Sequence, residues 1–105
     1  MPILSQRRQD AEVGALQRLI WTLIVARFRE LEREQGLRKV DLSQRLGIPR
    51  SQVQMWLAAP RNMTLKSAGR LAIALDARLV CGLEPLPIRP GAARGVGTSA
   101  DPEGR

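Results

Sequence analysis

The chain has 105 residues, of which 17 are basic and 10 acidic, and its net charge is +7. This length suits one small domain and disfavours two, and the single cysteine, Cys81, excludes an internal disulfide. With no histidine and one thiol, the chain lacks the ligands of a structural zinc site, so we expect no metal and no cofactor. Aromatic residues make up only 3% of the chain, so the core should consist of Leu, Ile, Val and Ala, which favours helices over strands.

The positive charge is concentrated in the middle third of the chain. Residues 36–70 hold seven basic residues and one acidic residue, whereas 1–35 hold six and five, and 71–105 hold four and four. Such an excess suits a polyanionic partner, either nucleic acid or an anionic membrane surface. The N-terminus has no signal-peptide pattern, and the longest apolar stretch, Leu19–Ala26, is too short to span a bilayer. We therefore expect a cytoplasmic protein.

The first predicted element is a long amphipathic helix from about Asp10 to Gln35, after a flexible N-terminus (1–9). Gly36 provides a C-cap. Trp21 neighbours the apolar face and is expected to be half exposed at an interface. Seven apolar residues recur at steps of three and four, which is the spacing of one helical face. They are Leu16, Leu19, Ile20, Leu23, Ile24, Phe28 and Leu31.

Two short helices follow, one over Val40–Gly47 that Gly47 closes, and one over Arg50–Leu57 that Pro49 introduces. After a loop at Ala59–Met63, Thr64 is the predicted N-cap of a helix that runs from Leu65 to about Leu75. The residues predicted to face inward from this last helix are Leu65, Ala68, Leu71, Ala72 and Leu75.

Beyond Asp76 the pattern changes to that of a half-buried strand, in which Leu79, Cys81 and Leu83 alternate with Val80 and Gly82. Cys81 would then be a small buried hydrophobic residue rather than a redox switch. The remaining sequence is rich in Pro, Gly and small residues and too poor in large apolar groups to fold. The expected organisation is a domain over 10–84 and a disordered tail over 85–105.

The two short helices carry the residue pattern of a helix-turn-helix. Counting from Lys39, Leu42 occupies the buried fourth position, Ser43 the small fifth, and Gly47 the ninth, where the turn needs a positive φ. The apolar anchors of the pattern are Leu46, Ile48, Val53 and Trp56. In an ordinary helical hairpin Gly47 would be only a C-cap, and the basic charge of this segment disfavours that alternative.

The segment GLRKVDLSQRLGIPRSQVQMWL resembles the Cro/C1 (Xre) helix-turn-helix family, over about Phe28–Leu75. The continuation is similar to antitoxins of the HipB type, whose Pro-x-Asn-x-Thr-Leu loop is matched by Pro60, Asn62, Thr64 and Leu65. The resemblance implies an all-α fold, a domain of four to five helices with a short C-terminal strand that pairs with its copy in a second subunit. It also implies a homodimeric repressor of its own operon that binds a HipA-like kinase toxin.

Three features depart from the family pattern. Lys39 stands where the family often has Gln, which affects a phosphate contact, and Leu57 stands where many members have Glu, which affects how the helix end is held. The long first helix exceeds the minimal family domain and could serve as an added dimerisation or partner surface.

The second helix of a helix-turn-helix inserts its N-terminal part into the major groove, so its exposed residues can reach base edges. The candidates for base contacts are Arg50, Ser51, Gln54 and Met55. The candidates for phosphate contacts, each of which could equally be a solvated surface group, are Arg38, Lys39, Gln52, Arg61, Asn62 and Lys66. The candidates for dimerisation are Leu79, Val80, Cys81 and Leu83. Arg50 could also be a solvated arginine, and Trp56 shares the face of Val53 and is assigned to the core.

Other function classes fit the sequence less well. An enzyme would need a nucleophile, a base or a metal site, and the chain has no histidine and no Gly-rich phosphate loop after a strand. An interaction module built on the long helix remains an alternative, although the mixed charge of that helix argues against binding to anionic lipid. Among regulators, a phage-type or stand-alone repressor is an alternative to the antitoxin. The APRNMTL loop and the strand favour the antitoxin. A dimer would bind double-stranded DNA at a palindromic operator.

Overall fold

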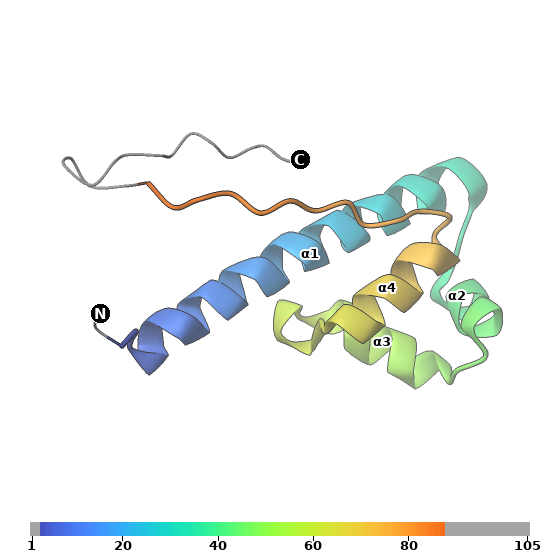
Figure 1. Cartoon of the computed structure of the whole chain (residues 1–105). Coiled ribbons are helices and arrows are strands. Elements are labelled where there is room, and N and C mark those ends of the chain that lie inside the picture. The colour runs from blue at the N-terminus through green and yellow to red at the C-terminus, as the bar shows by residue number, and fades with distance from the viewer. Residues whose placement is uncertain (1–2, 88–105) are drawn as a thin grey trace.

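The computed structural model describes residues 3–87, which contain four α-helices and one short 3₁₀ helix and no strand (Figure 1). Within these residues no helix is long and apolar enough to cross a bilayer. The elements are α1 (Gln6–Gln35), α2 (Lys39–Leu46), α3 (Arg50–Ala58), η1 (Pro60–Asn62) and α4 (Leu65–Ala74). Figure 1 shows α1 as a long rod whose second half packs against the other helices and whose first turns extend beyond them.

Helix α1 begins earlier than the sequence pattern predicts. The Ser5 hydroxyl oxygen accepts a hydrogen bond from the backbone N–H of Arg8 at 3.1 Å, so α1 starts at Gln6 and the segment expected to be a flexible N-terminus is helical from there. At the other end, Gly36 adopts a left-handed conformation with φ 69°, as predicted for a C-cap. The missed start has a physical reason, because the polar turn from Gln6 to Gln9 carries no apolar periodicity.

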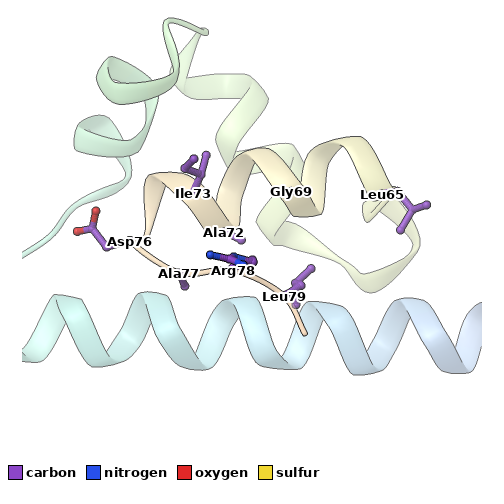
Figure 2. Close-up of a pocket in the computed structure, with 8 residues that line it drawn as sticks. All are labelled: Leu65, Gly69, Ala72, Ile73, Asp76, Ala77, Arg78 and Leu79. Carbon is purple, nitrogen blue, oxygen red and sulfur yellow. The ribbon is translucent and has the colours of Figure 1, made fainter. Parts of the chain in front are cut away.

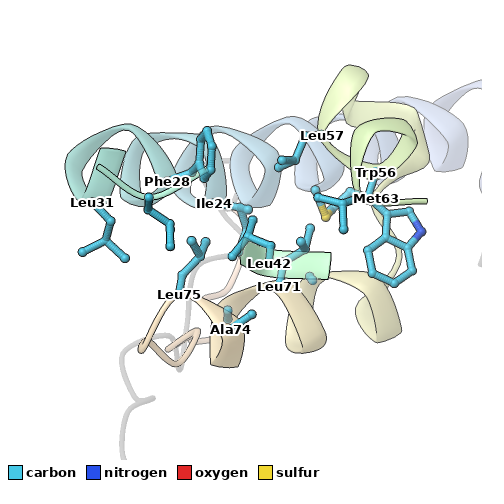
Figure 3. Packing of buried hydrophobic residues seen from close by; sticks show 14 residues of the cluster. Ile24, Phe28, Leu31, Leu42, Trp56, Leu57, Met63, Leu71, Ala74 and Leu75 are labelled. Atoms are coloured by element: carbon cyan, nitrogen blue, oxygen red, sulfur yellow. The ribbon is translucent and has the colours of Figure 1, made fainter. Parts of the chain in front are cut away.

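The core lies between the second half of α1 and the three short helices (Figure 3). Three residues of α1 enter it, Ile24, Phe28 and Leu31, and all are at most 8% exposed. The other members come from α2, α3, α4 and the loops beside them and are Leu37, Leu42, Val53, Trp56, Leu57, Met63, Ala68, Leu71, Ala72, Ala74 and Leu75. The core therefore holds the helix-turn-helix against a rigid helical support.

Polar side chains of α1 also bind the ends of the other elements. The Gln17 amide donates to the Met63 carbonyl oxygen at 3.0 Å, and Trp21 Nε1 donates to the Leu57 carbonyl oxygen at 3.0 Å. Arg27 Nε donates to the Leu75 carbonyl oxygen at 3.0 Å. The Leu57 and Leu75 carbonyl oxygens lie at helix C-termini, where no backbone N–H of the helix can donate to them. Trp21 is half-buried, as expected, but it lies against the end of α3.

Two parts of the predicted apolar faces do not enter the core. Leu16, Leu19 and Leu23 are 53%, 57% and 49% exposed, because they lie on a side of α1 that the other elements do not cover. At the same height along the axis, Gln17 and Trp21 face η1 and the end of α3. The prediction that Leu65 faces inward is wrong, since it is 81% exposed. Figure 2 shows Leu65 at one end of an open pocket on the outer side of α4 that Ile73 and Leu79 also line. The other predicted inward residues of α4 are buried.

The segment after α4 runs back along α1 toward its N-terminus (Figure 1). Residues 78–87 have no helix or strand in the single chain. Leu79 is half-buried, whereas Cys81 is exposed, which corrects the expectation that it is buried. The pairing predicted for this segment joins two chains and stays a prediction. Most of the predicted disordered tail, 88–105, lies outside the described residues.

Candidate nucleic-acid interface

The turn between α2 and α3 has the geometry that the sequence pattern requires. Gly47 adopts φ 67°, which places it in the left-handed region, and the backbone N–H of Ile48 donates to the Ser43 carbonyl oxygen at 3.1 Å. Leu42 is fully buried, and the small Ser43 is 8% exposed, with its hydroxyl donating to the Val40 carbonyl oxygen at 2.8 Å. A steep turn between two short helices results, with α3 outermost.

Helix α3 divides into a buried face and an exposed face. Val53, Trp56 and Leu57 are at most 9% exposed and pack in the core, which confirms the assignment of Trp56. The exposed residues include all four candidates for base contacts, Arg50, Ser51, Gln54 and Met55. A helix of this diameter fits the major groove of B-DNA, so an exposed face with cationic, polar and apolar side chains can contact base edges there.

One border of α3 brings predicted phosphate contacts next to a predicted base contact. Arg38, Lys39, Arg50 and Gln54 line one open groove of about 380 Å³, together with residues of α1. Arg38 and Lys39 are both exposed at the start of α2, where Arg38 forms an ion pair with Asp41 at 3.4 Å. The structure thus brings Arg50 next to Arg38 and Lys39, which precede it by more than ten residues in the sequence, along one edge of the exposed face.

The opposite border of α3 faces the start of α4. Gln52, Lys66 and Arg70 line a second open pocket there, so Gln52 lies beside α4 rather than on the outermost face of α3. The Arg70 guanidinium lies over the Trp56 ring, 5.7 Å from its centroid, at a distance typical of a cation–π contact. Sequence reasoning missed Arg70, although its position one helical turn after the exposed Lys66 is a signal that could have indicated it.

Two phosphate candidates lie in η1, where the structure shows additional roles. Asn62 Nδ2 donates to the Met55 carbonyl oxygen at 2.7 Å and so satisfies a backbone acceptor near the end of α3. Arg61 is exposed, and its carbonyl oxygen accepts from Gln17 at 3.3 Å. Thr64 and Ser67 exchange side-chain-to-backbone hydrogen bonds at the start of α4, which confirms Thr64 as the N-cap. Phosphate contacts by Arg61 and Asn62 stay predictions.

The start of α2 depends on an ionised carboxylate. The pKa of Asp41 is lowered mainly because the backbone N–H of Arg38 donates to its carboxylate at 2.8 Å, and the Arg38 guanidinium adds to this effect. A lowered folded-state pKa contributes stability that is present above the unfolded value of about 3.9 and is lost as the pH falls through the folded value. We therefore expect Asp41→Asn to unfold at a lower temperature than the wild type near pH 7. Thermal unfolding followed by circular dichroism below about pH 4 should show a smaller difference, and a difference independent of pH would contradict the assignment.

Comparison with known protein families identifies the family to which this helix-turn-helix belongs. The family model described as Helix-turn-helix matches residues 25–80, which is more than half of the chain. The chain belongs to the Cro/C1-type helix-turn-helix family. This Cro/C1-type protein is a DNA-binding transcription regulator, and its family is one of regulators rather than of enzymes. Comparisons with curated proteins and with solved structures found no match.

The match covers the helices that the sequence pattern assigns to DNA binding. It begins within α1, contains α2, α3 and α4, and ends at Val80 in the extended segment. The first half of α1 precedes it, which agrees with the prediction that this helix exceeds the minimal family domain.

Proposed function

We propose that this Cro/C1-type regulator is a dimeric repressor that inserts α3 into the major groove of a palindromic operator. The observation that carries the proposal is the exposed face of α3 with basic residues on both borders, Arg38 and Lys39 on one side and Lys66 and Arg70 on the other. Charges on both borders can bind the two phosphate strands that line a major groove. One α3 contacts few base pairs, so specific recognition requires a second copy at a second half-site.

The proposed contacts divide into two kinds. Arg50 is suited to a bidentate hydrogen bond to guanine O6 and N7, Gln54 to a contact with adenine, and Met55 to packing on a thymine methyl group. Ser51 can donate to or accept from a base edge. Lys39, Arg61 and Lys66 fix the position of α3 through phosphates and read no sequence. Gln52 joins this second group because it lies at the border toward α4.

The proposed dimer uses Leu79–Glu84 as a strand that pairs with its copy across the two-fold axis. Val80 is 86% exposed and Leu83 is fully exposed in the single chain, so both have apolar surface to bury. In a strand, Leu79, Cys81 and Leu83 would lie on one face, and Val80 and Gly82 on the other. Leu83→Asp should therefore weaken self-association in analytical ultracentrifugation, and a wild-type protein that stays monomeric at micromolar concentration would refute the dimer.

Within this role we assign the protein to the antitoxins of HipB type, which bind a kinase-like toxin. The support is the Pro60-x-Asn62-x-Thr64-Leu65 loop. Asn62 and Thr64 in it have structural roles as helix caps, so the loop supports this assignment as a family pattern. A kinase-sized neighbouring reading frame whose product co-purifies with this protein on co-expression would support the antitoxin. Its absence would leave a stand-alone or phage-type regulator.

The test of DNA reading compares two substitutions. Arg50→Ala should cost about 1–3 kcal/mol in operator binding and relax the preference at one base pair. Lys66→Ala should weaken binding to operator and random DNA alike and reduce the slope of log K against log salt by about one. Fluorescence anisotropy on the protein's own upstream region and on random DNA, at several salt concentrations, measures both effects.

The matched control is Arg7→Ala, which removes the same charge from an exposed position in the first turn of α1. It should leave operator preference unchanged. If Arg50→Ala lowers binding to operator and random DNA equally, Arg50 contacts phosphate and not a base. If the wild type binds its upstream region no better than random DNA, the proposed repressor is wrong at that operator.

A further inference from the structure

The part of α1 before Ile24 carries an exposed apolar stripe formed by Val13, Leu16, Leu19 and Leu23. Each of these side chains is between 49% and 57% exposed. They recur at steps of three and four, so they lie along one side of the helix. Leu79 and Val80 lie against one end of the stripe, where they line a pocket with Leu23, and they leave the stripe exposed. Contiguous apolar surface of this kind is typical of a protein–protein interface.

We propose that a second copy of this chain covers the stripe, with the two α1 helices packed antiparallel around a two-fold axis between Leu19 and Ile20. In this register Leu16 of one copy packs on Leu23 of the other, and Leu19 packs on the accessible part of Ile20, which also packs against the core of its own chain. Steps of three and four are the pattern with which two helices interlock along a seam. A two-fold axis brings the same surface of both copies together, so one stripe provides both halves of the interface.

Charge complementarity supports this register. With Leu16 opposite Leu23, Glu12 of one copy lies opposite Arg27 of the other, at both ends of the leucine contact. Glu12 forms no ion pair within the described residues. The Arg27 guanidinium contacts Glu30 at 2.7 Å and donates to the Leu75 and Asp76 carbonyl oxygens, and its side chain is 33% exposed, so Glu12 would add to these contacts as a second carboxylate. One turn further along, Arg8 lies next to Glu30 of the second copy. The leucine seam is thus closed at each end by opposite charges.

Other arrangements of the same two helices are less favourable. In a parallel pair Glu12 faces Glu12 and Arg27 faces Arg27, so like charges meet at both ends of the seam. Sliding the antiparallel pair by one turn places Glu12 opposite Glu30 in one direction and Arg8 opposite Arg27 in the other. Like-charge contacts destabilise helix pairs, so the charges select the register as well as the direction.

The α1 pairing adds a contact to the proposed dimer. It rests only on the proposal that the protein dimerises, because it requires self-association and not DNA binding. The pocket shared by Leu23, Ile24, Leu79 and Val80 places the start of the predicted strand beside the stripe. One interface can therefore contain both the strand and α1. The function of the extended helix is then to hold the two helix-turn-helix units in a fixed relation.

The first experiment measures self-association without DNA. Leu19→Glu should raise the dimer dissociation constant at least about tenfold, because each dimer loses two apolar contacts and gains two charges in the seam. The matched control, Ala11→Glu, adds the same side chain at an exposed position on another side of α1 and should dimerise like the wild type. Sedimentation equilibrium measures both, and circular dichroism checks that both variants keep their helices. Equal dimerisation by Leu19→Glu and Ala11→Glu would overturn the α1 pairing.

The second experiment tests the register by disulfide formation in a Cys81→Ser background. A mixture of Leu16→Cys and Leu23→Cys chains should cross-link, because the two positions face each other across the seam. Either variant alone should not, since its own two cysteines lie about 10 Å apart along the axis, beyond the reach of a disulfide. Cross-linking of Leu16→Cys alone would indicate a parallel pair and overturn the proposal. A dimer that forms without any of these cross-links would refute the α1 pairing and leave the strand-paired repressor intact, whereas a monomeric wild type would refute both dimer contacts.

Discussion

Leu71→Ala should lower the free energy of unfolding by about 2–5 kcal/mol. Leu71 is fully buried in α4, in the cluster that joins α1 to the helix-turn-helix. Truncation removes apolar contacts and leaves a cavity that the rigid surroundings fill only in part. A domain of this size has a small stability margin, so this loss would leave a large unfolded fraction. Urea unfolding followed by circular dichroism gives the value.

Leu65→Ala is the matched control for that prediction, because it makes the same change in the same helix. Leu65 is 81% exposed, and its truncation should change the free energy of unfolding by less than about 0.5 kcal/mol. If the two variants lost equal stability, α4 would be packed by a different face from the one described here. DNA binding by Leu65→Ala should remain at the wild-type level.

The helix ends of this protein were predictable where a local rule determines them. Gly36 and Gly47 both take positive φ, and Thr64 caps α4 through a hydrogen bond to the backbone of Ser67. Each of these devices depends on residues a few positions apart, so their signals are contained in a short stretch of sequence. The start of α1 was missed because the cap, Ser5, precedes a turn without apolar residues.

The sequence predicted which apolar residues share one side of a helix, but it was less reliable about which of them are buried. Leu65 fits the period of α4, and Leu19 fits that of α1, yet both are exposed. Periodicity shows that apolar residues share one side of a helix, but burial also requires that a neighbouring element covers that side. At the height of Leu19, η1 and the end of α3 cover the side of α1 that carries Gln17 and Trp21, and that choice of side depends on how the whole chain packs.

In the candidate interface, too, features set by local spacing were predictable and contacts between elements were not. The exposed positions of Arg50, Ser51 and Gln54 follow from the spacing of the helix-turn-helix alone, and the structure exposes all three. The contact of Arg70 with Trp56 and the hydrogen bond from Asn62 to Met55 join different elements. Sequence spacing does not reveal such contacts, because they depend on the angle at which α4 and η1 meet α3.

Gly47→Val should destabilise the fold by about 1–3 kcal/mol through backbone strain alone. Gly47 takes φ 67°, a conformation that a β-branched residue adopts poorly. A Cβ built at this position meets no heavy atom within 4 Å, so a steric clash with neighbours does not contribute. The strain falls on the turn that sets the angle between α2 and α3, and operator affinity should therefore decrease with stability. Thermal unfolding and fluorescence anisotropy measure the two effects.

Gly47→Asn tests whether backbone strain or the mere presence of a side chain causes the loss of stability. Asn adopts the left-handed conformation more readily than other residues, and the open space around Gly47 accepts its side chain. Its loss of stability should be clearly smaller than that of Gly47→Val, with a correspondingly smaller loss of operator affinity. Equal losses for both variants would show that the turn tolerates no side chain at all, against the open surroundings of Gly47. A graded loss would show that the positive φ of one residue holds α3 at the angle that DNA binding requires.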